Sequence, residues 1–247
     1  MLSKGSKLNE KKRLNSLPLL DSPKNVRLKF IKVGNLQYIS HLDLQRTFNR
    51  VITRACIPVW YTKGFNPHAK LVFSTPLSVG AQSKCEYLDI RIDRELPFSE
   101  IMERLNGELT DELCIIDAYE PTEDFSKITW SSYEIEICTT DASPNTAEQI
   151  KSLLTSSPLY LIKKTKSGEK QIDIIPLINS VDVSFDAITS SIKISCVLSA
   201  SATEYLNPEM LITAFKNNLG ILCGDPTKES YIIMRTGLFK GDMTEFS

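Results

Sequence analysis

The stretch from residue 38 to 80 reads YISHLDLQRTFNRVITRACIPVWYTKGFNPHAKLVFSTPLSVG and decides how the first half of the chain folds. Ser40, with Asp43 three residues later, has the pattern of a capping box and predicts that a helix begins here. Apolar residues then recur at helical spacing on one face, as far as about Ala55. The helix is followed by an extended segment, a tight turn at 63–68 and a further strand.

Segments on either side of this stretch complete a regular order of elements. A strand is expected from Val26, another over Glu86–Asp93, a helix over Phe98–Leu109 and a last strand over Leu113–Tyr119. The order β-α-β-β-α-β is that of the ferredoxin-like unit. Because the second half repeats this order, the sequence predicts an α+β protein of two ferredoxin-like units with mainly antiparallel sheets.

The predicted organisation has three parts. Residues 1–24 are polar and basic and are expected to form a flexible arm. The first unit covers 25–120 and carries the SHLD and KGFNPH motifs, and the second unit covers 131–240. No apolar run approaches the ~20 residues of a membrane span, and no segment has the pattern of a signal peptide. A cytoplasmic location and no membrane partner are therefore expected.

Charge is distributed unevenly along a chain whose formal net charge is −1. From Lys24 to Lys70 there are nine Lys and Arg residues against one acid, whereas Glu86 to Asp124 holds thirteen acids and three arginines. The two blocks predict opposite poles, with an anion-binding surface at the basic pole. The alternative is two solvated faces without a partner.

Two features of the basic block could bind an anion. Arg46, Arg50 and Arg54 recur every four residues on the face of the helix expected to be exposed, where an anionic partner would offset their mutual repulsion. The turn TKGFNPHAK is expected to be a rigid loop, because Gly64 permits a positive φ and Pro67 fixes φ. Four polar side chains would be presented by this loop: Lys63, Asn66, His68 and Lys70. The alternative for the loop is a purely structural hairpin.

The two histidines of the chain, His41 and His68, are the candidates for catalysis. An acid–base pair of this kind suits metal-independent RNA cleavage, but their spacing does not show that they meet. The six cysteines form no CxxC pair, and no Walker, GxGxxG or HExxH motif is present, so neither a metal nor a cofactor is expected. Phe65, in the middle of the turn, is expected to pack into the core rather than to stack on a base.

Several motifs follow one another over residues 26–93: F-x-K-x-G-x-L-x-Y-I-S-H-L-D-L-x-R, R-A-x-I-P-V, Y-x-K-G-F-N-P-H-x-K-L-x-F-x-x-P-L-x-V-G and E-Y-L-D-I. This run resembles the radical-SAM-associated domain family of unknown function. The resemblance implies a companion module that is fused to, or encoded beside, a cobalamin-binding-type radical SAM protein, and it implies no established activity. The chain lacks the CxxxCxxC that a radical SAM cluster needs, so it is not expected to be the radical enzyme.

The leading hypothesis is an accessory module that binds RNA or another anionic ligand and acts with a radical SAM partner. Asn66 and His68 would make directional hydrogen bonds. Basic side chains would contact phosphates: Arg46, Arg50, Arg54, Lys63 and Lys70. One alternative is a metal-independent RNA-processing enzyme that uses His41 and His68. The other is a protein–protein adaptor that binds no nucleic acid. Catalytic activity of the chain's own is not expected.

Overall fold

The computed structural model describes residues 9, 12–14, 16–156, 158–165 and 168–247. The chain divides into two compact units. The first comprises Met1–Val79, Ser83–Phe125 and Ser247, and the second comprises Gly80–Gln82 and Ser126–Phe246. Both units combine helices with antiparallel strands, so the protein is of the α+β class. In the part of the chain that the structure describes, no helix is long and apolar enough to cross a membrane.

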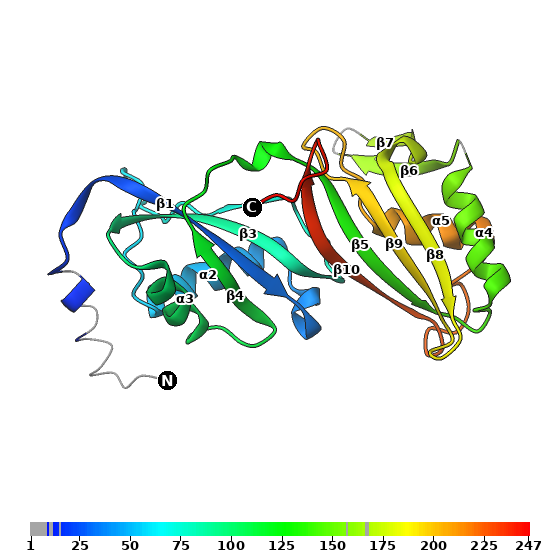
Figure 1. Cartoon of the computed structure of the whole chain (residues 1–247), viewed down its shortest axis with the longest axis horizontal. Helices are drawn as coiled ribbons and strands as arrows, with labels where there is room; N and C mark the ends of the chain where they lie inside the picture. The colour runs from blue at the N-terminus through cyan, green and yellow to red at the C-terminus, as the bar shows by residue number, and fades with distance from the viewer. Residues whose placement is uncertain (1–8, 10–11, 15, 157, 166–167) are drawn as a thin grey trace. The chain divides into compact units, whose positions relative to one another are not determined.

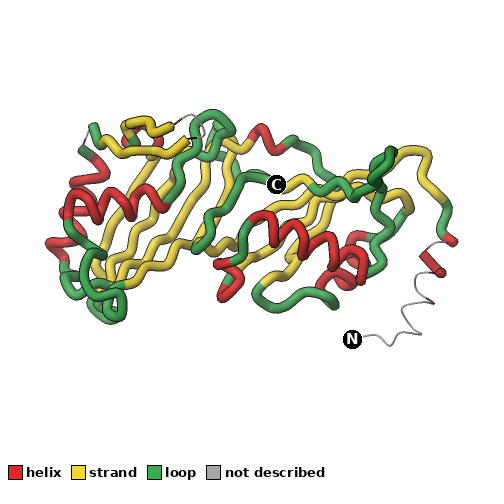
Figure 2. Tube along the Cα trace, turned by 180° about the vertical axis from the view of Figure 1, so that it is seen from behind, coloured by secondary structure: helices red, strands yellow, loops and turns green. Residues whose placement is uncertain are grey.

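The first unit is a sheet with helices on one face (Figures 1 and 2). Its strands are β1 (Leu19–Lys32), β2 (Val72–Phe73), β3 (Ala81–Arg94) and β4 (Leu113–Tyr119). Its helical segments are η1 (Gly34–Tyr38), α2 (His41–Arg54) and α3 (Phe98–Asn106). The strands lie in the order β4-β1-β3, all pairs are antiparallel, and β2 pairs with β3.

The core of this unit lies between the sheet and the helices α2 and α3. Alternate residues of β1, Val26, Leu28 and Phe30, are fully buried, as the two-residue period of a strand with one core face requires. Phe48 and Ile52, one turn apart on α2, are also buried in this core. The rings of Phe30 and Phe48 meet edge to face with centroids 5.0 Å apart. Each such side chain contributes about 1.5–3 kcal/mol through burial.

The described residues of the segment 1–24, for which the sequence predicts a flexible arm, make contacts with the first unit. Leu14 is buried in the core of the first unit, and Arg13 forms an ion pair with Glu100 of α3. Strand β1 begins at Leu19, five residues before the end of the expected arm. The apolar side chains of this basic segment explain the difference, because burying them offsets the entropy lost on ordering. Residues 1–8, 10–11 and 15 lie outside the described part.

In the second unit four strands lie side by side in the order β10-β5-β9-β8, and each pair of neighbours is antiparallel (Figure 1). Its strands are β5 (Ile128–Cys138), β8 (Ile178–Asp186), β9 (Ser191–Ser199) and β10 (Ser230–Lys240). A separate hairpin of β6 (Tyr160–Thr165) and β7 (Gly168–Asp173) precedes β8. The helical segments are η2 (Phe125–Lys127), α4 (Pro144–Thr155), η3 (Ile175–Leu177) and α5 (Glu209–Leu219).

Candidate nucleic-acid interface

The loop between α2 and β2 closes as a short hairpin around the KGFNPH motif. Tyr61 and Ala69 form an isolated antiparallel bridge, and the Thr62 amide donates to the His68 carbonyl oxygen at 3.0 Å. The His68 amide in turn donates to Thr62 Oγ1 at 3.2 Å. Gly64 has φ +144°, a conformation that is essentially restricted to glycine. The loop is therefore held at its base by hydrogen bonds and turned at its tip by Gly64.

The His68 ring takes part in closing the loop. Its Nδ1 lies 3.1 Å from the backbone oxygen of Asn66 and 3.2 Å from Thr62 Oγ1. A carbonyl oxygen can only accept, so the neutral ring carries its proton on Nδ1 and leaves Nε2 as an acceptor. Because His68 is exposed, this acceptor is available to a ligand that reaches the loop.

The tip of the loop projects into solvent. Phe65 has a relative exposure of 112%, so the prediction that it packs into the core is wrong. The residue follows the turn at Gly64 directly and leaves its ring in solvent. Lys63 and Lys70 are exposed, and neither they nor the side-chain amide of Asn66 has a partner among the described residues.

The arginines of α2 are exposed as expected, but two of the three are paired. Arg46 Nη1 lies 3.2 Å from Asp43 Oδ1 on the same helix. Arg54 Nε lies 2.9 Å from Glu108 Oε2, whose side chain is only 9% exposed. Arg50 has no partner in the described ranges. An exposed pair such as the first is weak, so Arg46 can exchange its partner. The Arg54 guanidinium donates to both the carboxylate and the backbone carbonyl oxygen of Glu108 and is held more firmly.

The basic and acidic blocks of the sequence do not form opposite poles. The register between β1 and β3 places Arg27 directly opposite Asp89, and Arg27 donates to both carboxylate oxygens at 2.8 and 2.9 Å. Arg27 is 1% exposed and also stacks on Phe125, 4.2 Å from the ring centre. Lys24 pairs with Glu95 and Glu120. Much of the local positive count is thus neutralised inside the first unit.

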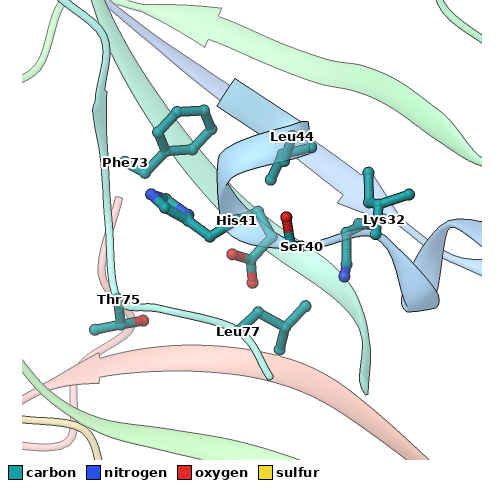
Figure 3. A pocket seen from close by; sticks show the side chains of 9 residues that line it. Lys32, Ser40, His41, Leu44, Phe73, Thr75 and Leu77 are labelled. Atoms are coloured by element: carbon teal, nitrogen blue, oxygen red, sulfur yellow. The ribbon is translucent and has the colours of Figure 1, made fainter. Parts of the chain in front are cut away.

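A small cavity opens beside the first turn of α2 (Figure 3). Its polar lining comes from separate segments of the first unit: Lys32, Ser40, His41, Thr75 and Glu86. Its apolar lining is Ile39, Leu44, Phe73 and Leu77. The cavity volume is about 10 Å³, which is close to the least that holds one water molecule.

Lys32 and Glu86 are charged residues of this cavity that the sequence analysis missed as site residues. They are 2% and 5% exposed, and Lys32 Nζ donates to the Gln37 carbonyl oxygen at 3.4 Å. A signal for both was present in the sequence. Lys32 continues the two-residue period of Phe30, and Glu86 that of Leu88, so each charge falls in phase with the core-facing residues of its strand.

His41 and His68 have separate surroundings. The His41 ring packs edge-on against Phe73 with centroids 5.1 Å apart and lines the cavity of Lys32 and Glu86. His68 does not line that cavity, and its ring contacts Thr62 and Asn66. Among the residues described, no group of His, Cys, Asp and Glu is arranged to hold a metal ion.

The capping box at Ser40 forms in a modified way. Ser40 Oγ accepts from the Asp43 amide at 3.2 Å, as predicted, and donates to Asp43 Oδ2 at 2.7 Å. This hydrogen bond lowers the pKa of Asp43, with a further lowering from Arg46. The carboxylate therefore favours its charged form at the positive end of the helix dipole.

Comparison with protein families places residues 25–208 in the family described as uncharacterized proteins conserved in bacteria, DUF2344. The chain therefore belongs to this family. The comparison with curated proteins found no match.

Two solved structures are distantly similar. One is an unknown protein from Galdieria sulphuraria, with 8% identity, 87% of this chain and 99% of the other covered, and a TM-score of 0.26. The other is a DypB variant from Rhodococcus jostii in complex with heme, with 11% identity, 88% and 94% covered, and a TM-score of 0.20. Neither likeness carries an argument at these TM-scores.

Proposed function

We propose that this chain is an accessory module that binds RNA through the loop at 61–70. One observation carries the proposal: Lys63, the Asn66 amide and Lys70 are exposed together on one loop without partners among the described residues, while Arg27 and Arg54 nearby in sequence are bound to carboxylates. Unpaired cations lose no internal ion pair when they contact phosphate, and release of counterions then favours binding. Phosphate contacts of this kind give affinity without sequence specificity.

The proposed interface also includes the exposed arginines of α2 that remain available. Arg50 has no partner in the described part of the chain, and Arg46 has only an exposed partner on its own helix. Arg54 makes no contribution here, because its guanidinium is held by Glu108. His68 contributes a hydrogen-bonding ring nitrogen, Nε2, because its Nδ1 is held by Asn66 and Thr62.

We also infer that both units have the ferredoxin-like topology. The order β4-β1-β3 with β2 beside β3 supports this for the first unit, and the order β10-β5-β9-β8 supports it for the second. Sheets of this topology carry RNA in several protein classes, but topology does not establish function. The proposal therefore rests on the loop.

A radical SAM protein of the cobalamin-binding type remains the proposed partner, supported by the motif resemblance of residues 26–93 alone. A cytoplasmic location is part of the same proposal and is supported by the cysteines, all six of which are free. The enzyme alternative loses support from the separate surroundings of His41 and His68.

Fluorescence anisotropy with a labelled mixed-sequence RNA tests the proposal. The slope of log association constant against log salt should fall by roughly one unit for each lysine removed in Lys63→Ala and Lys70→Ala. Lys127→Ala and Lys228→Ala change exposed lysines of the second unit and serve as matched controls that leave the slope unchanged.

Absence of binding by the unaltered chain at low salt would refute the proposal. The adaptor hypothesis would then be tested by co-elution with a radical SAM protein. RNA cleavage that disappears in His41→Ala or His68→Ala, while binding survives, would replace the accessory-module proposal with the enzyme.

A further inference from the structure

We propose that the ligand of the 61–70 loop is single-stranded RNA, with an unstacked base lying on the ring of Phe65. This inference rests on the proposed function and names the form of RNA that the same loop takes. It is carried by the position of one aromatic side chain relative to the polar groups that flank it.

Phe65 is exposed beyond what a folded protein normally leaves to water. Its relative exposure of 112% means that the ring is not buried against any of the residues that the structure describes, so it makes no contribution to their core. Apart from its two chain neighbours, no described residue lies within 4 Å of the position that a Cβ would take at Gly64, so the turn next to Phe65 is open in that direction. A ring in this position offers its face to a planar ligand.

The base of the loop is fixed before any ligand arrives. The Tyr61–Ala69 bridge and the hydrogen bonds between Thr62 and His68 hold the two ends of the loop together. Ordering a side chain or loop on binding costs free energy, so a loop that is already closed loses less on association. The arrangement favours a platform for a ligand over a loop that folds only on binding.

The groups beside the ring match what a single strand offers. Lys63 precedes Phe65 and Lys70 follows it in the sequence, and both are exposed. The two cations of this loop would contact phosphates of the bound strand. The side-chain amide of Asn66 supplies a donor and an acceptor, and the neutral ring of His68 supplies an acceptor at Nε2. Amide and imidazole groups of this kind hydrogen-bond to exposed base edges.

A duplex would leave most of these groups unused. In double-stranded RNA the bases are stacked on each other and paired along their edges, and side chains cannot read the deep, narrow major groove. A phenyl ring at a loop tip would then meet only sugar and phosphate. Aromatic side chains that bind a single strand instead stack on its bases, largely without regard to sequence.

Anisotropy titrations of the full chain with an unstructured RNA of about 12 nucleotides, alone or annealed to its complement, test the inference. Phe65→Ala should weaken single-strand binding about 5- to 150-fold with the salt slope unchanged, since no charge is lost. The affinity of Phe65→Ala for the duplex should stay within about twofold of that of the unaltered chain. Phe65→Trp should retain single-strand affinity, and the fluorescence of the added indole should be quenched on stacking.

Ile188→Ala is the matched control, because Ile188 is a 94% exposed apolar residue of the second unit. This variant should bind like the unaltered chain. If Phe65→Ala binds single strands like the unaltered chain while the Lys63→Ala and Lys70→Ala variants still lower the salt slope, the stacking inference is wrong and the proposed function stands. If Phe65→Ala weakened binding of the duplex and of the single strand equally, the stacking inference would also be overturned. If the unaltered chain binds neither RNA, the proposed function and the inference both fall.

Discussion

Replacing Arg27 by Met tests whether this one cation of the basic block is structural rather than part of a binding surface. The guanidinium donates to Asp89 at 2.8 and 2.9 Å and to the Glu123 carbonyl oxygen at 2.9 Å, and it stacks on Phe125. Breaking a buried ion pair costs about 3–5 kcal/mol. The Asp89 side chain is 23% exposed and regains some hydration, which favours the lower end of this range.

We therefore expect Arg27→Met to lower the free energy of unfolding by about 3 kcal/mol, or the melting temperature by about 6–12 °C. Urea denaturation followed by circular dichroism measures the change. Arg50→Met is the matched control, since Arg50 is exposed and has no partner in the described ranges, and it should stay within about 0.5 kcal/mol. Equal stability of the two variants would refute the reasoning. The Arg27→Met/Asp89→Asn double variant should lose less than the two single variants combined, because no unpaired charge remains.

Three further outcomes are expected. Gly64→Val should destabilise the chain by about 1–3 kcal/mol in thermal melts because of its φ of +144°, whereas Gly107→Ala, at φ −64°, should be neutral or stabilising; indistinguishable melts would contradict a strained turn. Burial raises the pKa of Cys196 to about 12, so iodoacetamide at pH 8 should label exposed Cys138 and Cys223 and spare Cys196; mass spectrometry showing modified Cys196 in the folded chain would overturn this. The hydrogen bond from Lys193 lowers the pKa of Asp186 from 3.8 to about 2. The ionised Asp186 therefore stabilises the folded chain above pH 4, and this contribution is lost as the pH falls towards 2. Asp186→Asn should flatten the fall in stability over that range; an unchanged pH profile would count against the pair.

Local patterns predicted the local structure well. The helix at 41–54 follows from the Ser40 cap and the apolar spacing, and the structure places Phe48, Val51 and Ile52 on its buried face. The turn at Gly64 follows from the residue types that a tight turn requires. Both depend on interactions within a few residues, which is why one sequence suffices to find them.

Features set by distant pairing could not be predicted in the same way. The count of charges along the sequence indicated a basic pole, but Arg27 and Asp89 are neighbours only through the register of β1 and β3. The burial of Leu14 likewise depends on a core assembled from later segments. Phe65 is exposed, although an apolar residue of this size is usually buried. Its residue type alone did not indicate the exposure. Such a departure from sequence rules is most often found at functional positions.

Backbone amide shifts in an NMR titration test the central claim most directly. Adding an unstructured RNA of about 12 nucleotides to the ¹⁵N-labelled chain should shift the amide signals of Lys63–Lys70 first and most, excluding Pro67, which has no amide proton. The Phe65→Ala variant should show smaller shifts in the same signals at equal RNA. Shifts confined to other residues, with the loop signals unmoved at saturation, would contradict the assignment of the loop as the RNA-binding site.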